Sequence, residues 1–428
     1  MRILCIDVEC MGLDFVLRSA AAGHQVRWFR YSTKPLRDGE GMTGFQIVDD
    51  WRPHMPWARE GLILSTGNWR YSQELDRYRD LGYRIFAPTA ASARLEIDRE
   101  AGQDAMRAAG IEIPPFEVFD SLKAARDFAA KHDETYVHKP MGDEADKSLT
   151  YVAHDQEDLC GWLDHQIRSG KKLKGKCMLQ QKIDLLCELG VSGWFGPEGF
   201  LPDKWQVCVE HKNLMNDELG PATGEQGTVC QYVDEDKMAT EILKPMEPIL
   251  RTLGHRGDFA VGCGIDKRGR AYPFEFTARC GWPAFMIQMA SHFGDPAQWM
   301  RDLLDGNDTL KVSYDVAIGV VMAQPRYPYN SSPPELVEGN PIRGIKDAGN
   351  AVHLVSAMKS RGEYETTGEM VAVVTGLGKT IEKARDKVYS SVSKVRFPNR
   401  MYRTDIGCKV IDALPKLHQF GYLADMRA

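Results

Sequence analysis

The chain has 428 residues, of which 43% are hydrophobic and 27% charged, as expected for a globular protein of two to four domains. The net charge of -6 at pH 7 excludes the basic surface typical of nucleic-acid-binding proteins. The ten cysteines include no CxxC pair, which predicts free thiols in a reducing compartment. No signal peptide and no apolar run of ~20 residues occurs, so we expect a cytoplasmic protein without membrane partners.

The first ~90 residues alternate between strand-like and helix-like stretches. "RILCIDV" is short and apolar, "LDFVLRSAAAGH" is helix-like with Gly23 as its end, and "QVRWF" is again strand-like. "GLILST", "ELDRYRDLGY" and "RIFAPT" continue the alternation. This pattern predicts a small parallel-sheet domain.

The next segment predicts one long helix over "SARLEIDREAGQDAMRAAG", ended by Gly110, and then the extended "IEIPPFEVF". Ser121 is placed to cap the helix "LKAARDFAAKH". The stretches "TYVHKP", "SLTYVA" and "CMLQQKI" predict strands. These elements form a second region with helices and strands in turn.

A glycine-rich stretch, "ELGPATGEQGTV" (218–229), follows the polar "VEHKNLMNDE". Its glycines predict a loop, which is either a surface turn or a loop that faces phosphate. Further on, "GCGIDKRGRAYPFEFTARCG" predicts a hairpin whose second strand carries Glu275, Thr277 and Arg279 on one face. A helix is expected around "FMIQMASHF". From "SYDVAIGVVMAQ" onward strands predominate, and the predicted last helix is "TIEKARDKVYSSVSKV".

Several charged residues fit a nucleotide site, although each also has an ordinary structural explanation. Lys139 and Lys147 flank a polar turn between two strands, where two cations could bind a polyphosphate or simply face solvent. Gln180, Gln181 and Glu188 are predicted on a strand and the turn after it, where they could bind adenine and ribose or form an ordinary edge strand. Glu275, Thr277 and Arg279 could hold Mg²⁺ and phosphates or form a solvated strand face.

Taken in order, these stretches resemble the phosphoribosylamine–glycine ligases of purine synthesis, a family of the ATP-grasp superfamily. "IFAPTAASARLE", "EHKNLMNDELGPATGEQGTV", "EFTARCGWP", "TGEMVAVVTGLG" and "YRTDIG" are similar to that family's motifs and are collinear with them. The resemblance covers residues 81 to 407, roughly four-fifths of the chain. It implies an α/β (α+β overall) ATP-grasp fold. The expected parts are an N-terminal parallel-sheet domain (1–120), a lid subdomain (121–195), a central ATP-grasp domain (196–313) and a strand-rich C-terminal domain (314–428).

The resemblance also implies roles for individual residues, together with ATP and Mg²⁺ (or Mn²⁺) as cofactors. The implied catalytic residues are Lys147 and Arg279. The implied nucleotide-binding residues are Arg99, which replaces a family lysine, Lys139, Lys147, Gln181, Lys182, Ile183 and Glu188. The implied substrate residues are Asn68, Trp69, Gly220, Pro221, Thr223, Gly224 and Arg279. The implied metal ligands are Glu275 and Thr277, the latter standing where the family has Asn.

Two groups of motifs depart from the family. The lid sequence "GLAAGKGV" is here "GDEADKSL", and the N-terminal "GSGGREHA" is here "DVECMGLDF", with Glu9 and Asp14 in place of a glycine-rich phosphate loop. Trp69 and Arg70 replace a second acceptor motif. These acids would repel a phosphorylated amine if they faced it, and an aromatic ring beside a cation suits a planar acceptor.

The leading hypothesis is therefore an ATP-dependent carboxylate–amine ligase that activates a small amino acid, glycine by resemblance, as an acyl phosphate. One alternative is a paralogue with a different, nucleoside-like amine acceptor. Another is a nucleotide-binding protein that has lost ligase activity, and a binding module or scaffold is a third. The expected partners are small-molecule substrates, an amino acid and an amine, for a monomer or homodimer without nucleic acid.

Overall fold

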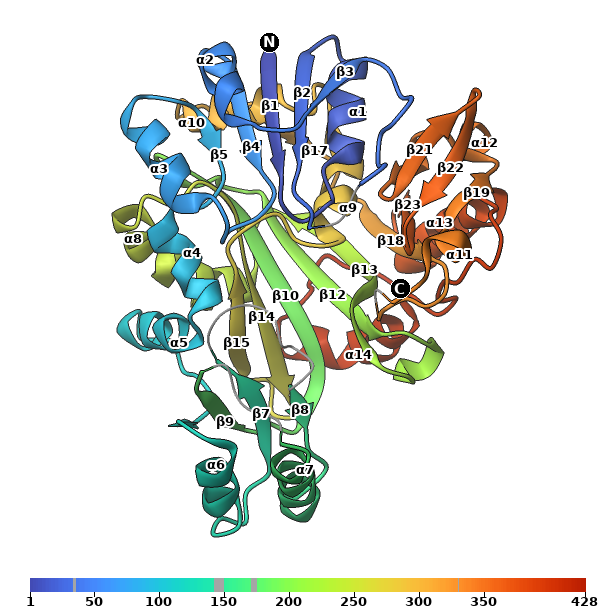
Figure 1. Cartoon of the computed structure of the whole chain (residues 1–428). Helices are drawn as coiled ribbons and strands as arrows, with labels where there is room; N and C mark the ends of the chain where they lie inside the picture. Colours follow the sequence, from blue (N-terminus) through green and yellow to red (C-terminus); the bar gives the residue numbers. More distant parts are fainter. Residues whose placement is uncertain (34–35, 142–149, 171–174, 330) are drawn as a thin grey trace.

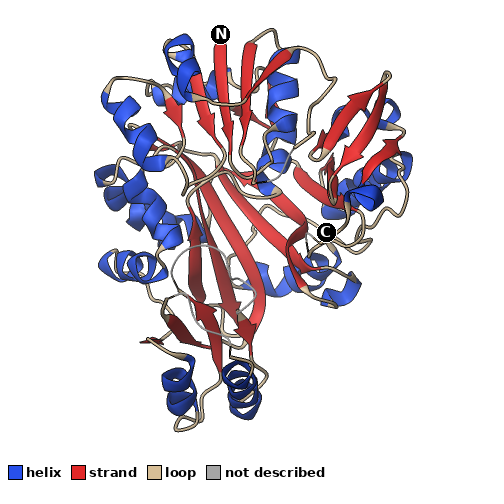
Figure 2. Cartoon of the chain, in the orientation of Figure 1, coloured by secondary structure: helices blue, strands red, loops and turns tan. Residues whose placement is uncertain are grey.

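The computed structural model describes residues 1–33, 36–141, 150–170, 175–329 and 331–428. Its larger sheets are a five-stranded sheet near the N-terminus, a four-stranded sheet, and a nine-stranded sheet between them (Figure 1). The long strands of the nine-stranded sheet run from the N-terminal sheet toward the four-stranded one (Figure 2). The mixture of helices and sheets confirms the predicted fold class.

The N-terminal sheet is parallel throughout, with strand order β3-β2-β1-β4-β5. Its strands and helices are β1 (Arg2–Asp7), α1 (Leu13–Ala21), β2 (Gln25–Arg30), β3 (Phe45–Val48), the short η1 (Arg52–His54), α2 (Met55–Ala58), β4 (Leu62–Ser65), α3 (Ser72–Asp80) and β5 (Ile85–Phe86). β1 is apolar because both of its faces are buried, Ile3 in one core and Leu4 in another. The sequence missed β3, η1 and α2.

The predicted long helix over residues 92–110 is wrong in one respect, because it is two helices. α4 (Ala90–Ile97) and α5 (Arg99–Ala108) are separated by Asp98, whose backbone is extended (φ -100°, ψ 96°). The Asp98 side chain accepts a hydrogen bond from the Ala101 N–H. It therefore acts as the N-cap of α5 and interrupts the helix there.

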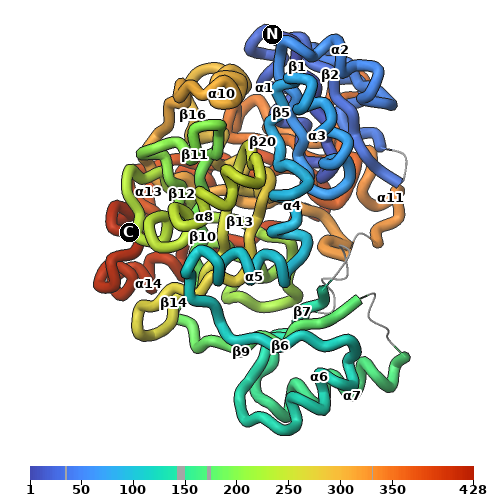
Figure 3. The backbone as a smooth tube through the Cα atoms, turned by 90° about the vertical axis from the view of Figure 1, so that its left-hand side faces the viewer, coloured from blue at the N-terminus to red at the C-terminus, as the bar shows by residue number. Residues whose placement is uncertain are grey.

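The four-stranded sheet has the antiparallel order β6-β9-β7-β8, with β6 (Phe116–Phe119), β7 (Tyr136–Pro140), β8 (Tyr151–Val152) and β9 (Cys177–Gln181). α6 (Leu122–Ala129) and α7 (Gln156–Arg168) pack on it. Ser121 caps α6 as predicted, since its side chain accepts from the Ala124 N–H. This sheet and its two helices protrude at one end of the molecule (Figure 3). The predicted polar turn at 142–149 lies outside the described residues.

The nine-stranded sheet has the order β15-β14-β10-β12-β13-β18-β23-β20, with β11 paired to β10. Its strands are β10 (Leu185–Gly196), β11 (Gly199–Phe200), β12 (Trp205–Asn213), β13 (Ala222–Val233), β14 (Gly257–Asp266), β15 (Ala271–Thr277), β18 (Val316–Ala323), β20 (Val352–Leu354) and β23 (Met370–Gly378). Near it lie the π-helical η4 (Ala239–Leu243), α8 (Lys244–Thr252), α9 (Ala284–Ala290), α10 (Gln298–Leu304) and the pair β16 (His292–Phe293) and β17 (Lys311–Val312). The sheet thus continues across residue 313, and the domain boundaries remain predictions.

The glycine-rich stretch 218–229 is only partly a loop, which corrects the prediction. β13 begins at Ala222, so Gly224 and Gly227 lie in a strand. A Cβ at Gly227 would lie 2.6 Å from the Gly319 carbonyl of the neighbouring strand. Glycine is therefore required here by close packing between strands rather than by a turn.

The C-terminal segment adds a three-stranded sheet, β19-β22-β21, and several helices. Its elements are α11 (Pro334–Val337), β19 (Glu338–Ile342), α12 (Ile345–Ala348), η5 (Gly349–Ala351), β21 (Ala357–Ser360), β22 (Glu363–Thr367), α13 (Ile381–Lys394) and α14 (Cys408–Gln419). α13 is the predicted last helix, but α14 follows it and was missed. The chain end packs on the β14–β15 hairpin, where Tyr422 donates to the Gly269 carbonyl at 3.0 Å.

No helix within the described ranges combines the length and the apolar character needed to cross a membrane.

Candidate active site

One face of the nine-stranded sheet carries an acidic and basic cluster, which we call the floor: Glu188 on β10, and Glu210 and Lys212 on β12. Side chains two residues apart on a strand share a face, and Glu210 is paired with Thr228 of β13. Lys212 Nζ lies 3.0 Å from Glu210 and 3.6 Å from Glu188. Glu210 in particular raises the pKa of Lys212 above its usual value. Lys212 is therefore a permanent cation of the floor.

Lys139, on β7 of the four-stranded sheet, lies close to this floor. Its Nζ donates to Gln180 at 2.7 Å and lies 5.4 Å from the ring centre of Phe274. Burial lowers the pKa of Lys139 to about 8, while Glu275 and Glu188 act to raise it and Arg99 and Lys212 act to lower it. Lys139, predicted as a lid lysine, is therefore close enough to interact electrostatically with Glu188 and Lys212 of the floor and with Glu275 of β15. Lys147 lies outside the described residues.

The predicted adenine segment connects β9 to β10. The Gln181 N–H donates to the Pro115 carbonyl and the Lys182 N–H to the Thr135 carbonyl, both at 2.8 Å. Lys182 Nζ donates to the Ala153 carbonyl. These donors are engaged within the protein, so an adenine here would use Ile183 and backbone carbonyls. Glu188 lies within β10 rather than in the expected turn.

The edge strand β15 carries Glu275 and Thr277 opposite Gly262 and Ala260 of β14. Glu275 accepts a hydrogen bond of 2.7 Å from Arg99, which lies at the start of α5. A Cβ at Gly262 would meet no atom within 4 Å, so the space beside Glu275 is open. Within the described ranges, no three His, Cys, Asp or Glu residues form a metal cluster. One carboxylate and one hydroxyl suit a Mg²⁺ completed by nucleotide phosphates and water, as Mg²⁺ commonly is.

Arg279 lies beyond the end of β15, so the prediction that it shares a strand face with Glu275 and Thr277 is wrong. Its Nε lies 3.2 Å from Glu96 of α4. Glu96 also accepts from Asn68 at 2.6 Å and from the Ala278 N–H at 2.8 Å. Glu96 therefore links two predicted substrate residues, Asn68 of the N-terminal domain and Arg279 of the hairpin.

Of the two acids predicted after β1, Asp14 does not act as predicted. Asp14 is buried and pairs with Arg18 at 2.8 Å and His353 at 2.7 Å. It therefore does not face an acceptor. A different residue, Asp7, accepts from the Met11 and Gly12 N–H groups at 3.1 and 2.8 Å. The backbone donors at the start of α1 thus bind the chain's own carboxylate.

Arg70 is held between two aromatic rings at the carboxyl edge of the N-terminal sheet. Its guanidinium carbon lies 3.8 Å from the ring centre of Tyr31 and 4.4 Å from that of Trp69. One face of Trp69 is therefore covered by the chain itself. The Arg70 guanidinium therefore occupies a face of Trp69 on which a planar acceptor was expected to stack. The arrangement instead offers the exposed Arg70 as a cation at this site.

The predicted substrate residues of the glycine-rich stretch border the floor. Gly220 and Pro221 lie in the turn between β12 and β13, and Gly220 has φ +79°. Thr223 Oγ1 donates to the Lys212 carbonyl at 2.6 Å. A Cβ at Gly224 would lie 3.6 Å from Trp282. The turn, the floor and the segment after β15 are therefore neighbours.

Sequence reasoning did not assign several residues of this site. These residues are Asp7, Glu96, Glu210 and Lys212. The alternation in "VCVEHK" could have placed Glu210 and Lys212 on one strand face.

The chain is similar to known proteins in both sequence and fold. Residues 317–409 match the family Phosphoribosylglycinamide synthetase, C domain. The phosphoribosylamine--glycine ligase of Neisseria meningitidis serogroup B is 26% identical over 349 residues, 79% of this chain and 81% of that protein. The crystal structure of the Thermotoga maritima phosphoribosylamine--glycine ligase aligns with a TM-score of 0.72 at 21% identity, covering 95% of this chain and 100% of that one.

A more distant structure shares the same fold. The biotin carboxylase domain of the Hydrogenobacter thermophilus 2-oxoglutarate carboxylase, solved with MgADP, ADP and bicarbonate, aligns with a TM-score of 0.62. Its sequence is 12% identical, over 98% of this chain and 95% of that one. The fold, the collinear motifs and the C-terminal match lead to one conclusion. The chain is similar in sequence to the phosphoribosylamine–glycine ligases and shares the fold of the ligase from Thermotoga maritima.

Proposed function

We propose that the chain is an ATP-dependent ligase that joins a carboxylate to an amine, with glycine and phosphoribosylamine as the substrates. The observation that carries this proposal is the meeting of Lys139, Lys212, Arg99 and Glu275 between the four-stranded sheet and the floor. The substrates are those in the printed name of the relatives. The hypotheses of another acceptor and of lost activity are not favoured, since the curated relatives carry the name of an active ligase.

ATP and Mg²⁺ are the proposed cofactors. Lys139, Lys212 and Arg99 supply positive charge for the phosphates, and Glu275 with Thr277 would hold the metal. When bound, Mg²⁺ would neutralise phosphate charge during transfer. Arg99 would then release Glu275 to the metal and turn to a phosphate. Gln181 to Ile183 and Glu188 are the proposed adenine and ribose contacts, and Lys147 a further lid cation.

The reaction forms an O–P bond and a C–N bond; it breaks a P–O bond of ATP, the C–O bond of the acyl phosphate and one N–H bond, whose proton is released to solvent. A carboxylate oxygen attacks the γ-phosphorus and ADP leaves, giving an acyl phosphate. The amine nitrogen then attacks the acyl carbon, phosphate leaves, and the nitrogen loses a proton. Arg279, which is paired with Glu96, would stabilise the negative oxygen of the tetrahedral intermediate.

The amine acceptor is proposed to bind between the N-terminal sheet edge and the segment after β15. Asn68 and Gly220 to Gly224 border this place. Since Asp7 already accepts from the backbone N–H groups of Met11 and Gly12, the acceptor phosphate would bind side-chain cations, and Arg70 is one candidate at that edge. A cytoplasmic location, a monomer or homodimer, and the lack of nucleic-acid or membrane partners remain predictions.

The test is an assay of ADP release with ATP, Mg²⁺, glycine and freshly generated phosphoribosylamine, followed by mass spectrometry of the product. We expect a product that contains both substrates, formed at about 1–10³ per second. Omitting each substrate in turn is the control. No ligated product, with ATP binding intact by calorimetry, would overturn the proposal.

A further inference from the structure

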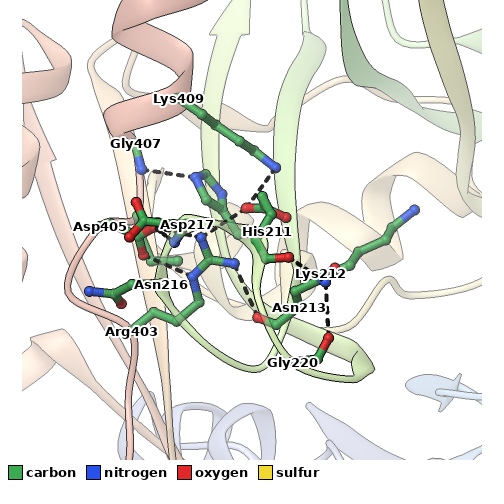
Figure 4. Close-up of polar contacts among 12 residues, drawn as sticks. His211, Lys212, Asn213, Asn216, Asp217, Gly220, Arg403, Asp405, Gly407 and Lys409 are labelled. Atoms are coloured by element: carbon green, nitrogen blue, oxygen red, sulfur yellow. Dashed lines mark hydrogen bonds and ion pairs between the residues drawn. The ribbon is translucent and has the colours of Figure 1, made fainter. Parts of the chain in front are cut away.

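Arg403 is a buried arginine whose contacts lead to the turn before the glycine-rich strand. Its side chain is 1% exposed. Nη1 donates to the Asn213 carbonyl at 3.1 Å and Nη2 to Glu218 at 2.8 Å. Asp405 accepts from the same guanidinium at 2.7 and 2.8 Å, which orients it (Figure 4). Arg403, in a segment near the C-terminus, thus binds the turn 213–221 at two residues, Asn213 and Glu218.

Two neighbouring residues strengthen this attachment. Asp405 also accepts from the Asp217 N–H at 2.9 Å. Thr404 accepts from Asn216 Nδ2 at 2.7 Å and donates its backbone N–H to Asn216 Oδ1 at 3.1 Å. The segment 403–407 therefore binds the backbone and the side chains of the turn.

The same segment also holds the residue on the other side of Lys212. His211 Nε2 accepts a hydrogen bond of 3.1 Å from the Gly407 N–H. Burial above all lowers the pKa of His211 to about 3, so the ring is neutral and stays an acceptor. Lys212 thus lies between two anchored residues, His211 and Asn213, while its side chain extends away from Arg403 (Figure 4).

The turn needs such anchors because its backbone is unfavourable. Asp217 and Glu218 have φ angles of 59° and 55°, in the left-handed region that residues other than glycine avoid. Met215 and Leu219 expose 55% and 61% of their surface, so packing of these side chains does not hold the turn. Hydrogen bonds from the segment 403–407 therefore stabilise this backbone.

We propose that Arg403 is a positioning residue for the ligase reaction. It fixes the turn 213–221 from the C-terminal side, so that Lys212 stays on the floor and Thr223 and Gly224 keep their place beside it. The inference deepens the proposed function and depends on it only for its kinetic test. It assigns to the C-terminal segment a part in shaping the active site, without contact with substrate.

A double-mutant cycle on kcat/KM tests the action through Lys212. We expect Arg403→Met and Lys212→Met each to lower kcat/KM about 10–100-fold, as for misplacement of a reacting group by about 1 Å. The double variant should lie within about threefold of Lys212→Met, because the two residues act as one unit. Arg403→Lys should recover part of the activity. Multiplying effects in the double variant would overturn the inference.

Arg400→Met is the matched control. Arg400 lies three residues before Arg403, and its described hydrogen bonds go to the carbonyls of Val392 and Val395 rather than to the turn. Its kcat/KM should stay within about twofold of wild type, as for substitutions away from the site. Equal kinetics of the Arg403→Met and Arg400→Met variants would count against a role for Arg403.

A second measurement needs no turnover. Chymotrypsin should cut Arg403→Met after Met215 or Leu219 at least about tenfold faster than wild type, since cleavage of an opened segment follows its population. Glu218→Gln, a milder change of a part-exposed partner, should show a smaller increase without general unfolding. Unchanged cleavage of Arg403→Met would overturn the inference. If the wild-type protein shows no ligase activity, only the proposed function is overturned. The cleavage rates would still test whether Arg403 holds the turn.

Discussion

Arg99 donates a 2.7 Å hydrogen bond to Glu275, so the metal ligand predicted on β15 is paired with the phosphate-binding cation predicted on α5. The pair lies beside the open space over Gly262. When a nucleotide and its metal bind, we expect Glu275 to contact the metal and Arg99 to contact a phosphate instead of each other. The ion pair therefore keeps the proposed phosphate-binding group and the proposed metal ligand beside each other.

Glu275→Gln should lower kcat by about 10²–10³-fold, because the amide keeps the volume but cannot stabilise the phosphates through a metal. The melting temperature should change little, since the Glu275 side chain is 49% exposed. Steady-state kinetics at saturating Mg²⁺ and a thermal melt measure both. Glu363→Gln, at the exposed start of β22, is the control. Thr277→Asn, which restores the family residue, should retain activity. Wild-type kcat in Glu275→Gln would show that the strand face is only solvated.

ATP affinity should weaken as the pH rises through about 8. Burial lowers the pKa of Lys139 to about 8, so its ammonium is fully charged only below that pH. If the charged form binds the phosphates, the affinity of the free protein falls by about tenfold per pH unit above the pKa. Isothermal titration calorimetry between pH 7 and pH 10 measures this. Lys139→Arg, which stays charged, should remove the decline in ATP affinity. An equal decline in that variant would show that another group causes it.

Asp14→Asn should destabilise the protein at pH 7 by about 3 kcal/mol, as for a buried ion pair that loses one partner. Although burial acts to raise it, His353 and Arg18 hold the pKa of Asp14 below its usual value of 3.8. This stabilisation is present above pH 3.8 and is lost as the pH falls through the lower folded pKa. Denaturant unfolding at pH 7 and pH 3 should show the difference shrinking. Asp50→Asn removes an exposed pair and should cost less than about 1 kcal/mol.

Gly227→Ala should destabilise the protein by about 1–3 kcal/mol, because its methyl group would overpack the sheet. The Cβ would lie 2.6 Å from the Gly319 carbonyl and 2.8 Å from Ile406. Gly262→Ala is the matched control, since nothing lies within 4 Å of its Cβ. Chemical denaturation compares the two. Equal stability of the two variants would refute the packing explanation for Gly227.

Elements with local signals could be predicted from the sequence. The alternation in the first ~90 residues, the cap at Ser121 and the β14–β15 hairpin follow from periodicity and turn residues within a short window. Lys139 and Glu275 could be proposed because each stands on a predicted strand within a motif of recognisable order. Such signals need no knowledge of which strands are neighbours.

Which distant residues are in contact depends on strand order and packing, and is seen only in the tertiary structure. The pairing of β12 with β10 and β13 brings Lys212 to Glu188, and a contact over 185 residues joins Arg403 to Glu218. Strand order and the need for glycine at residue 227 depend on neighbours far away in the chain, which no local window contains. Asp14 shows the same limit: its acidity was visible in the sequence, but burial against His353 turned it from a presumed repulsive group into a structural ion pair.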